Sequence, residues 1–372
     1  MDKASFTAAL RDAVKGLEQE LDEKRIWVHP YAQADGTQIE GHWREGSPHR
    51  EMDRAAGAIE NLPGEERPPW NPPLSPEVRQ KIDDLGLNSW PEKGKKAKEV
   101  LGDFPDTQHK YADVVRDARG KVTRITYSDP ERAALHKKIV DHFIEGHVAP
   151  RKGSAVQLFF AGGTASGKST ALKAAKELGS GIVPDDAVLV NPDEIKVMLP
   201  EFEQMQGAGD AYAASGVHEE SSDIAKMILR EAQKRGLNII VDGTGDSDAT
   251  KFLRKLATAA DEGYKVRVFM VDLPENVAIE RMISRAEEPG PDHHRYVPVG
   301  ELRKMHRGAA GRHLNWRNLD IIDQWEVWST NTPGRGNAIL AAKGGKGKYK
   351  VEDEYEYQRI LRKAKHDPNR PA

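Results

Sequence analysis

Residues 155–170 of the chain read AVQLFFAGGTASGKST, and this stretch decides the fold. Its first part, AVQLFF, is a largely apolar run of the kind found in strands that are buried on both faces of a sheet. Residues 162–169, GGTASGKS, fit the pattern G-x-x-x-x-G-K-[ST] of a phosphate-binding loop. A helix is expected to follow from Ser169 to Leu178 and to end at Gly179. A strand, a loop and a helix in this order indicate a nucleotide-binding loop and argue against a glycine-rich turn with an incidental lysine.

The residues of this loop suit a nucleoside triphosphate accompanied by Mg²⁺. Small residues let the backbone fold around a phosphate, and the N-terminus of the next helix adds roughly half a positive charge at the same place. Lys168 can reach the β- and γ-phosphates, and the hydroxyl of Ser169 can bind Mg²⁺. The residues expected to contact the nucleotide are Gly162, Gly163, Thr164, Ala165, Ser166, Gly167, Lys168, Ser169 and Thr170.

Strands and helices alternate through the region around this loop. The further strands expected are AVLV (187–190), LNIIV (237–241), KVRVFMV (265–271) and a last one near EVWST (326–330). The further helices expected cover residues 129–145, 219–235, 248–262 and 275–287. Alternation of this length predicts the α/β class, with a doubly wound, mainly parallel sheet of the P-loop kinase type and helices on both faces.

Composition divides the chain into five parts. These are an N-terminal region (residues 1–61), a proline-rich linker (62–76), an irregular charged segment (77–128), the domain of alternating strands and helices (129–331) and a basic, charged tail (332–372). In the smaller, mixed N-terminal region we expect a helix over residues 4–24 and a hairpin that turns at Asp35-Gly36. The tail is rich in glycine, lysine and charge, so we expect it to be mobile apart from one short helix.

The composition also excludes several classes of protein. The chain has 372 residues, a formal net charge of −3 and no cysteine, so disulfides and thiolate metal sites are excluded. No run reaches the roughly eighteen apolar residues of a membrane helix, and the first residues lack the apolar core of a signal peptide. The pair His293-His294 lacks the helical spacing of a zinc site. We therefore expect a cytoplasmic protein without contact to a membrane, and no metal beyond the ion that accompanies a nucleotide.

Two carboxylates follow strands in the way that places side chains at the ligand-binding edge of a sheet. Asp242 ends the strand LNIIV, where the alternative is an ordinary Asp-Gly turn. Asp193 follows AVLV and can accept a proton from a hydroxyl that attacks the γ-phosphate. Its alternative role is to cap the helix that runs toward Pro200, and the two roles are compatible.

Three arginines suit the mobile lid that covers a transferring phosphate. Arg281 and Arg285 lie one turn apart on a predicted helix, and Arg295 follows in a loop. Phosphoryl transfer depends on alignment and on positive charge near the phosphate oxygens, which arginine supplies. The alternative is a solvated basic face without function.

The ordered set of motifs resembles the zeta-toxin family of P-loop kinases over roughly residues 129–331. The set comprises NPDEIKVMLP after the loop, then HEESSDIAKMIL, NIIVDGT, and R-x₃-R followed by RYVP. The resemblance implies an enzyme that uses ATP and Mg²⁺ to phosphorylate UDP-N-acetylglucosamine on its amino sugar. It also implies a partner antitoxin, or immunity protein, that blocks the nucleotide site.

The resemblance further implies roles for individual residues. Lys168 and Ser169 correspond to the family's ligands for ATP and metal, Asp193 to its base, and Arg285 and Arg295 to the arginines that stabilise the transferring phosphoryl group. For the acceptor, Glu219 resembles the acidic substrate residue, with the adjacent Glu220 as an alternative. Asp242 stands where the family often has glutamate, and Thr244 where a threonine contacts substrate. The chain departs from the family in its loop sequence GGTASGKS and in the longer connection EEPGPDHH before Arg295.

Other functions remain open from the sequence. One alternative is a P-loop kinase with another acceptor, such as NAD, a metabolite or a nucleic-acid 5′ end, because one scaffold can serve many acceptors. Another is a non-catalytic, nucleotide-dependent binding protein. The absence of a basic stripe in the kinase region argues against nucleic acid. The combination of Asp193, Arg285 and Arg295 argues against a switch, which needs no acceptor base.

Overall fold

The computed structural model describes residues 71–120, 122–245, 249–288, 296–332 and 337–366, together with the backbone of short strands between residues 25 and 45. These short strands are β1 (Arg25–Val28), β2 (Tyr31–Ala32), β3 (Gln38–Ile39) and β4 (His42–Glu45). β2 pairs with β3 and β1 with β4, both in antiparallel fashion, which confirms the hairpin expected around Asp35-Gly36. The expected helix over residues 4–24 and most of the expected linker lie outside the described residues.

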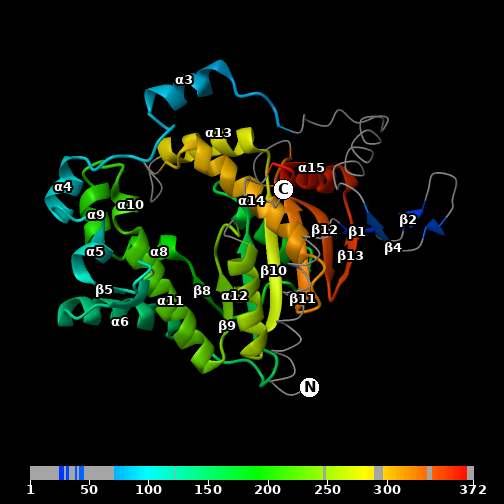
Figure 1. Cartoon of the computed structure of the whole chain (residues 1–372), viewed down its shortest axis with the longest axis horizontal. Coiled ribbons are helices and arrows are strands. Elements are labelled where there is room, and N and C mark those ends of the chain that lie inside the picture. The colour runs from blue at the N-terminus through cyan, green and yellow to red at the C-terminus, as the bar shows by residue number, and fades with distance from the viewer. Residues whose placement is uncertain are drawn as a thin grey trace.

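One seven-stranded sheet, counted over the described residues, forms the centre of the fold in the order β13-β12-β11-β10-β7-β9-β8 (Figure 1). Its strands are β7 (Val156–Ala161), β8 (Ala187–Val190), β9 (Asn238–Val241), β10 (Lys265–Asp272), β11 (Ile322–Ser329), β12 (Ile339–Gly345) and β13 (Lys348–Val351). Strands β8, β9, β7, β10 and β11 are parallel to their neighbours, and β12 and β13 continue the sheet in antiparallel fashion. The expected doubly wound, mainly parallel sheet is confirmed.

The chain order explains where a ligand can bind. From β7 the chain moves to β8 and β9 on one side, and then crosses to β10 and β11 on the other side. The direction of winding therefore reverses at β7, and such a reversal opens a crevice at the carboxyl ends of the strands. The loop at residues 162–167 leaves β7 at this position.

The apolar run of β7 is explained by helices on both faces of the sheet. Phe159 and Ala161 pack into a core cluster that includes residues of α6, α11, α12, α14 and α15. Leu158 and Phe160 point to the opposite face and pack with Ala171 of α7. Alternate residues of one strand thus reach different cores, so the strand needs apolar side chains at nearly every position.

The helices of the domain are α6 (Pro130–Ile144), α7 (Lys168–Glu177), α8 (Pro192–Lys196), α9 (Pro200–Gln206), α10 (Ala213–Gly216), α11 (His218–Arg235), α12 (Ala249–Asp261), α13 (Glu275–Glu287) and α14 (Val299–Trp316). The helices expected from the sequence at α6, α7, α11, α12 and α13 agree with these bounds within about two residues. In the part of the chain that the structure describes, no helix is long and apolar enough to cross a membrane.

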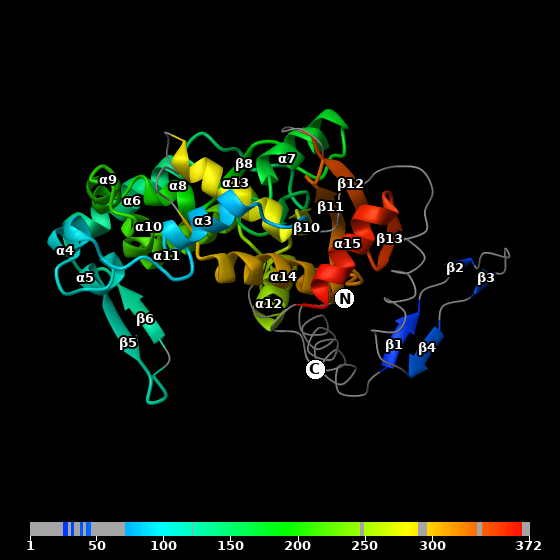
Figure 2. The ribbon, with the colours of Figure 1, turned by 90° about the horizontal axis from the view of Figure 1, so that it is seen from above.

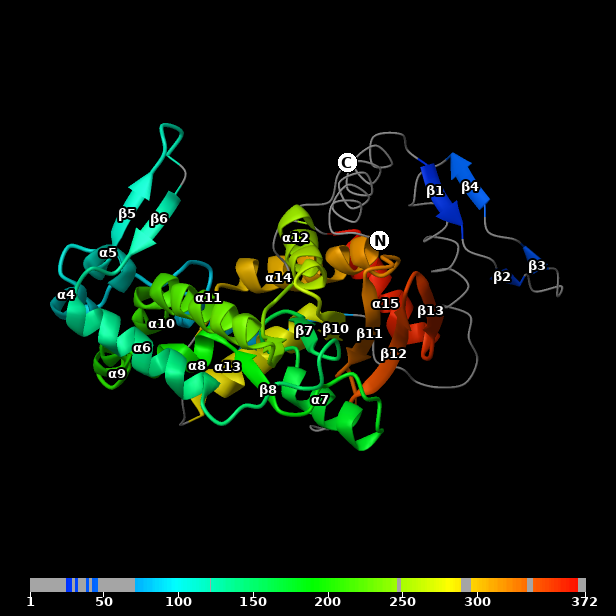
Figure 3. The ribbon, with the colours of Figure 1, turned by 90° about the horizontal axis from the view of Figure 1, so that it is seen from below.

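Residues 77–128 are more regular than their composition indicates. They contain α4 (Lys95–Leu101), α5 (Thr107–Tyr111), the hairpin of β5 (Asp113–Arg116) and β6 (Val122–Thr126), and most of α3 (Pro76–Asp84). Ser75 and Asp106 cap α3 and α5 with side-chain oxygens. These helices are too short for helical periodicity to be visible in the sequence. The β5–β6 hairpin projects from the body of the protein (Figures 2 and 3).

The expectation of a mobile C-terminal tail is wrong for residues 337–366. β12 and β13 extend the sheet beyond β11, and α15 (Glu354–Ala364) packs Tyr357 and Ile360 into the main core. The sequence there looks solvated because lysines and glutamates surround these apolar positions. Several of the charged side chains are themselves buried, since they pair with one another and with the end of β10.

We predict that truncation after residue 332 abolishes cooperative folding. The shortened chain would lose the strands that cover the edge of β11, and would leave Asp272 buried without its two cationic partners, at a cost of about 3–5 kcal/mol for the lost ion pairs alone. Thermal unfolding followed by circular dichroism will test this prediction. Truncation after residue 366 is the matched control and should unfold like the full chain. A cooperative transition of the shorter protein at the full-length temperature would contradict the prediction.

Candidate functional site

The phosphate loop joins the end of β7 to the start of α7, as the sequence predicts. Gly167 precedes the helix with a φ of 81°, in the left-handed region that glycine adopts without strain. Ala165 also has a positive φ, 61°, which costs energy for a residue with a side chain. Backbone strain of this kind is concentrated at ligand-binding loops, where the surrounding structure holds it in place. The loop is therefore built to keep one shape.

Lys168 and Asp242 meet beside this loop. Lys168 is the first residue of α7, and its Nζ lies 3.4 Å from the carbonyl oxygen of Gly162 and 3.7 Å from Oδ1 of Asp242. Burial raises the pKa of Asp242, although the charge of Lys168 acts in the opposite direction. The carbonyl oxygen of Thr244 accepts a 2.8 Å hydrogen bond from the backbone N–H of Gly162. The end of β9 is thus fastened to the start of the phosphate loop.

Two buried oxygen atoms beside the phosphate loop bear on whether a nucleotide with Mg²⁺ fits there. Among the described residues, Oγ of Ser166 and Oδ1 of Asp242 are buried without a hydrogen-bond partner. Buried polar atoms of this kind are satisfied by a ligand, an ion or water. Ser169 is exposed in the first turn of α7, where its hydroxyl can face bound phosphate and metal. The residues present therefore fit a phosphate ligand with a cation.

The described residues contain no group of three or more histidine and acidic side chains arranged as a metal site.

Asp193 lies at the same edge of the sheet. It lies half-exposed in the first turn of α8. Its Oδ1 forms a 3.0 Å ion pair with Nζ of Lys196, whose side chain is buried. The cap of α8 is Asn191, whose side chain accepts from the N–H of Asp193, so capping is not the role of Asp193. Burial, together with the charges of Asp242 and Asp193, raises the pKa of Glu194. The structure therefore brings Asp193 and Asp242 into one acidic environment beside the phosphate loop.

Glu219 and Glu220 have different surroundings at the start of α11. Glu219 is exposed, whereas Glu220 is fully buried and bound by two side chains of α6. Arg132 donates to Glu220 at 2.6 Å and to Glu201 at 2.9 Å, and His136 Nε2 lies 2.6 Å from Glu220 Oε1. Burial acts to raise the pKa of Glu220, but the hydrogen bonds from His136 and Arg132 outweigh it and hold the pKa at about 2. Glu220 has a structural role, and Glu219 remains the candidate for the acceptor.

The three arginines of the expected lid differ in position. Arg281, on α13, is half-buried and its Nη1 donates to Oγ1 of Thr330 at 3.0 Å, so it does not form a solvated basic face. Arg285 is exposed one turn later on the same helix. Arg295 lies outside the described residues.

His306 is part of the site, and sequence analysis did not identify it. Its Nε2 lies 2.9 Å from the carbonyl oxygen of Thr164, and its ring is so close to Gly163 that a Cβ there would lie 2.2 Å from Cδ2. Burial lowers the pKa of His306 to about 3, and the charge of Lys363 acts in the same direction. The ring is therefore neutral and donates from Nε2 to the loop. A histidine in the middle of a long helix gives no sequence signal for this role.

Comparisons with known proteins agree with this geometry. Residues 140–317 match the family model for zeta toxin, which confirms the resemblance expected from the motifs. No curated protein matches the chain. A crystal structure of AvrRxo1-ORF1:AvrRxo1-ORF2 with sulphate ions is 19% identical, with a TM-score of 0.52, and the match covers 69% of this chain and 82% of that chain. A structure of AvrRxo1-ORF1:-ORF2 with ATP has the same identity and coverage and a TM-score of 0.51. At this identity the likeness shows a common fold.

We predict that Glu220→Ala lowers the free energy of unfolding by about 3–5 kcal/mol, because it leaves Arg132 buried without one of its partners. Glu219→Ala is the matched control and should change it by less than about 0.5 kcal/mol. Since the pKa of Glu220 is lowered in the folded state, its contribution is full above pH 4.5 and is lost as the pH falls toward 2. Urea titrations at several pH values will measure both effects. Equal stability of the two variants at neutral pH would refute the structural role of Glu220.

Proposed function

We propose, because residues 140–317 match the zeta-toxin family model, that this protein is a kinase that transfers the γ-phosphate of ATP to a hydroxyl of a small acceptor. The observation that carries the proposal is the ion pair of Lys168 with Asp242 beside the phosphate loop, together with Asp193, which is close enough for its charge to raise the pKa of Asp242. A loop alone would bind nucleotide. A carboxylate half-exposed to solvent beside it adds a group that can accept a proton from an incoming hydroxyl.

On the nucleotide side, the proposed reaction depends on holding the phosphates of ATP in a fixed position. The backbone N–H groups of the loop receive the phosphates, and the positive end of α7 adds to their attraction. Lys168 is close enough to the loop to bind the β- and γ-phosphates, and Ser169 would hold Mg²⁺ through its hydroxyl. When bound, Mg²⁺ neutralises charge on the phosphate oxygens during transfer. Arg285 and Arg295 are proposed to neutralise the same oxygens from the lid.

Asp193 is proposed as the general base. Its ion pair with Lys196 orients the carboxylate, and the side chain stays about half-exposed, where an acceptor hydroxyl can approach it. Glu219 at the start of α11, and Asp242 and Thr244 at the end of β9, are proposed to bind the acceptor. These residues come from elements that flank the phosphate loop on the β9 side.

A nucleotide sugar such as UDP-N-acetylglucosamine is the acceptor we propose, because the zeta-toxin resemblance extends to these positions. The same resemblance leads us to propose an antitoxin or immunity protein that covers the nucleotide site, and a cytoplasmic reaction, where ATP and nucleotide sugars are available. Incubation with ATP, Mg²⁺ and a panel of nucleotide sugars, NAD and an oligonucleotide, read by mass spectrometry, will test the acceptor. A mass gain equal to HPO₃ on a nucleotide sugar supports the proposal, and a gain on NAD or the oligonucleotide alone refutes the sugar.

We predict that Lys168→Ala abolishes phosphotransfer while the protein stays folded, because the lysine offsets γ-phosphate charge and is not part of a core cluster. Lys173→Ala, on an exposed face of the same helix, is the matched control and should keep wild-type turnover. Turnover by Lys168→Ala close to that of the control would rule out the phosphate loop as the catalytic site.

For Asp193→Asn we predict that ATP still binds while transfer slows at least roughly a hundredfold, as the loss of a general base implies. Glu203→Gln, which changes an exposed carboxylate on α9, should leave the rate unchanged. Steady-state rates and ATP affinity from calorimetry will separate the two properties. A variant that loses ATP affinity instead would show that Asp193 serves nucleotide binding.

A further inference from the structure

Thr330 lies directly behind the phosphate loop, just after the end of β11. Its Oγ1 donates a buried 2.7 Å hydrogen bond to the backbone carbonyl oxygen of Ser166. The methyl group of Thr330 lies next to Gly167. If Gly167 had a side chain, its Cβ would be only 2.9 Å from Cγ2 of Thr330. Thr330 itself is almost fully buried. One side chain therefore contacts two successive residues of the loop, one through its hydroxyl and the other through its methyl group.

The direction of this hydrogen bond is fixed by Arg281. Its Nη1 donates to Oγ1 of Thr330 at 3.0 Å, and its Nη2 donates to the carbonyl oxygen of Thr330 at 2.9 Å. A guanidinium has donors and no acceptor, so the hydroxyl must accept from Arg281. The single hydroxyl hydrogen of Thr330 is then available for Ser166. This arrangement joins α13 to the phosphate loop through one hydroxyl group.

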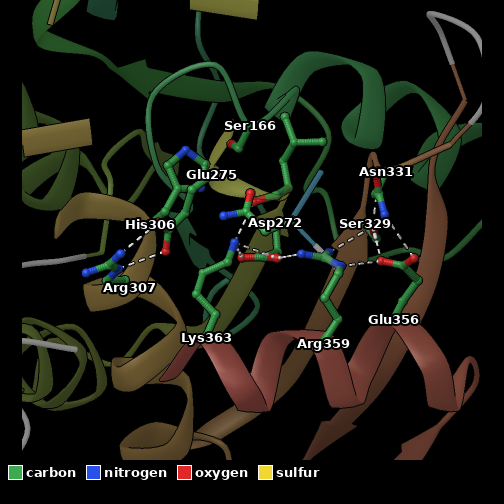
Figure 4. Close-up of polar contacts among 12 residues, drawn as sticks. Ser166, Asp272, Glu275, His306, Arg307, Ser329, Asn331, Glu356, Arg359 and Lys363 are labelled. Carbon is green, nitrogen blue, oxygen red and sulfur yellow. Dashed lines mark hydrogen bonds and ion pairs between the residues drawn. The ribbon is translucent and has the colours of Figure 1, made fainter. Parts of the chain in front are cut away.

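The backbone around Thr330 is also held firmly. The N–H of Thr330 donates to the carbonyl oxygen of Asp272 at 3.1 Å. On either side, Ser329 Oγ donates to Glu356 at 2.6 Å and Asn331 Nδ2 donates to Glu356 at 3.4 Å (Figure 4). The side chain of Thr330 thus points toward the phosphate loop, whereas the side chains of its neighbours Ser329 and Asn331 point toward α15.

The helix α15 is in turn fixed by buried charges. Asp272, at the end of β10, lies 2.6 Å from Nη1 of Arg359 and 2.8 Å from Nζ of Lys363 (Figure 4). Arg359 also binds Glu356 at 2.8 Å. Burying these groups is tolerated because each charge has a partner at hydrogen-bond distance. The position of Thr330 is therefore set from two sides, by α13 and by α15.

We infer that Thr330 is a positioning residue for phosphotransfer, and that its hydroxyl keeps the phosphate loop in the shape that binds ATP. This inference rests on the proposed kinase function. The loop needs such support because Ala165 holds a strained backbone φ of 61°, and the carbonyl of the next residue, Ser166, is the group that the hydroxyl of Thr330 binds. Without the hydroxyl, this carbonyl loses its partner and the loop can relax. ATP affinity should fall while the core of the protein remains intact.

The test compares Thr330→Val, which removes the hydroxyl and keeps the shape, with Thr330→Ser, which keeps the hydroxyl. Calorimetric titration with ATP and Mg²⁺ should show a dissociation constant about tenfold higher for Thr330→Val, the size expected for a lost buried hydrogen bond. Thr330→Ser should restore affinity to within about threefold of wild type. Thr332→Val is the matched control, since this threonine also donates to a carbonyl, that of Asn337, at an exposed position. It should bind ATP like the wild type.

Each outcome decides the inference. Wild-type affinity of Thr330→Val overturns it, and so does a loss of affinity that Thr330→Ser fails to restore, because the methyl packing would then be the cause. An equal loss in Thr332→Val also overturns it. A turnover assay of Lys168→Ala separates this inference from the proposed function. If Lys168→Ala keeps wild-type turnover, the kinase proposal fails. If Lys168→Ala loses turnover while Thr330→Val binds ATP like the wild type, the positioning role alone fails.

Discussion

A buried negative charge organises the nucleotide side of this protein. The carboxylate of Asp272 is completely enclosed at the end of β10, where an isolated ion would be strongly unfavourable. Its pKa is nevertheless lowered, since the charges of Lys363 and Arg359 outweigh the effect of burial. The need to pair this charge fixes α15 against the sheet. Through Glu356 and the backbone of Asp272, the same contacts fix the residues that support the phosphate loop.

A second buried cluster has a similar effect around the start of α11. Arg132 of α6 binds Glu220 of α11 and Glu201 of α9, and stacks over the ring of Tyr111 in α5 at 4.1 Å. Gln108 of α5 also binds Asp223 of α11 at 2.7 Å. Segments before the family-matched region are thus attached to it through charged and polar contacts. The folded unit is therefore larger than residues 140–317, and it includes elements whose sequence is mostly charged.

The sequence predicted most of the central fold, because a buried parallel strand and the glycine that ends a helix leave clear local patterns. Strand β7 and the helices α6, α11 and α13 are examples. The phosphate loop was predicted for the same reason, since its function needs small residues in a fixed order. The contributions of Thr330, His306 and Arg359 could not be predicted, because each depends on a partner far away in the chain. The charged stretch around α15 was misjudged because ion pairing hides its burial from any measure of local polarity.

The distance along the chain between the phosphate loop and its support has a consequence for protein synthesis. Ser166 and Thr330 are 164 residues apart, and Lys363 follows Asp272 by 91 residues. A ribosome therefore exposes the complete loop sequence long before the residues that hold its shape have been translated. During that interval the nascent chain carries every residue of the nucleotide-binding motif without a supported loop. Competence to bind nucleotide should accordingly arise late in translation, after Thr330 and the residues of α15 have been added to the chain.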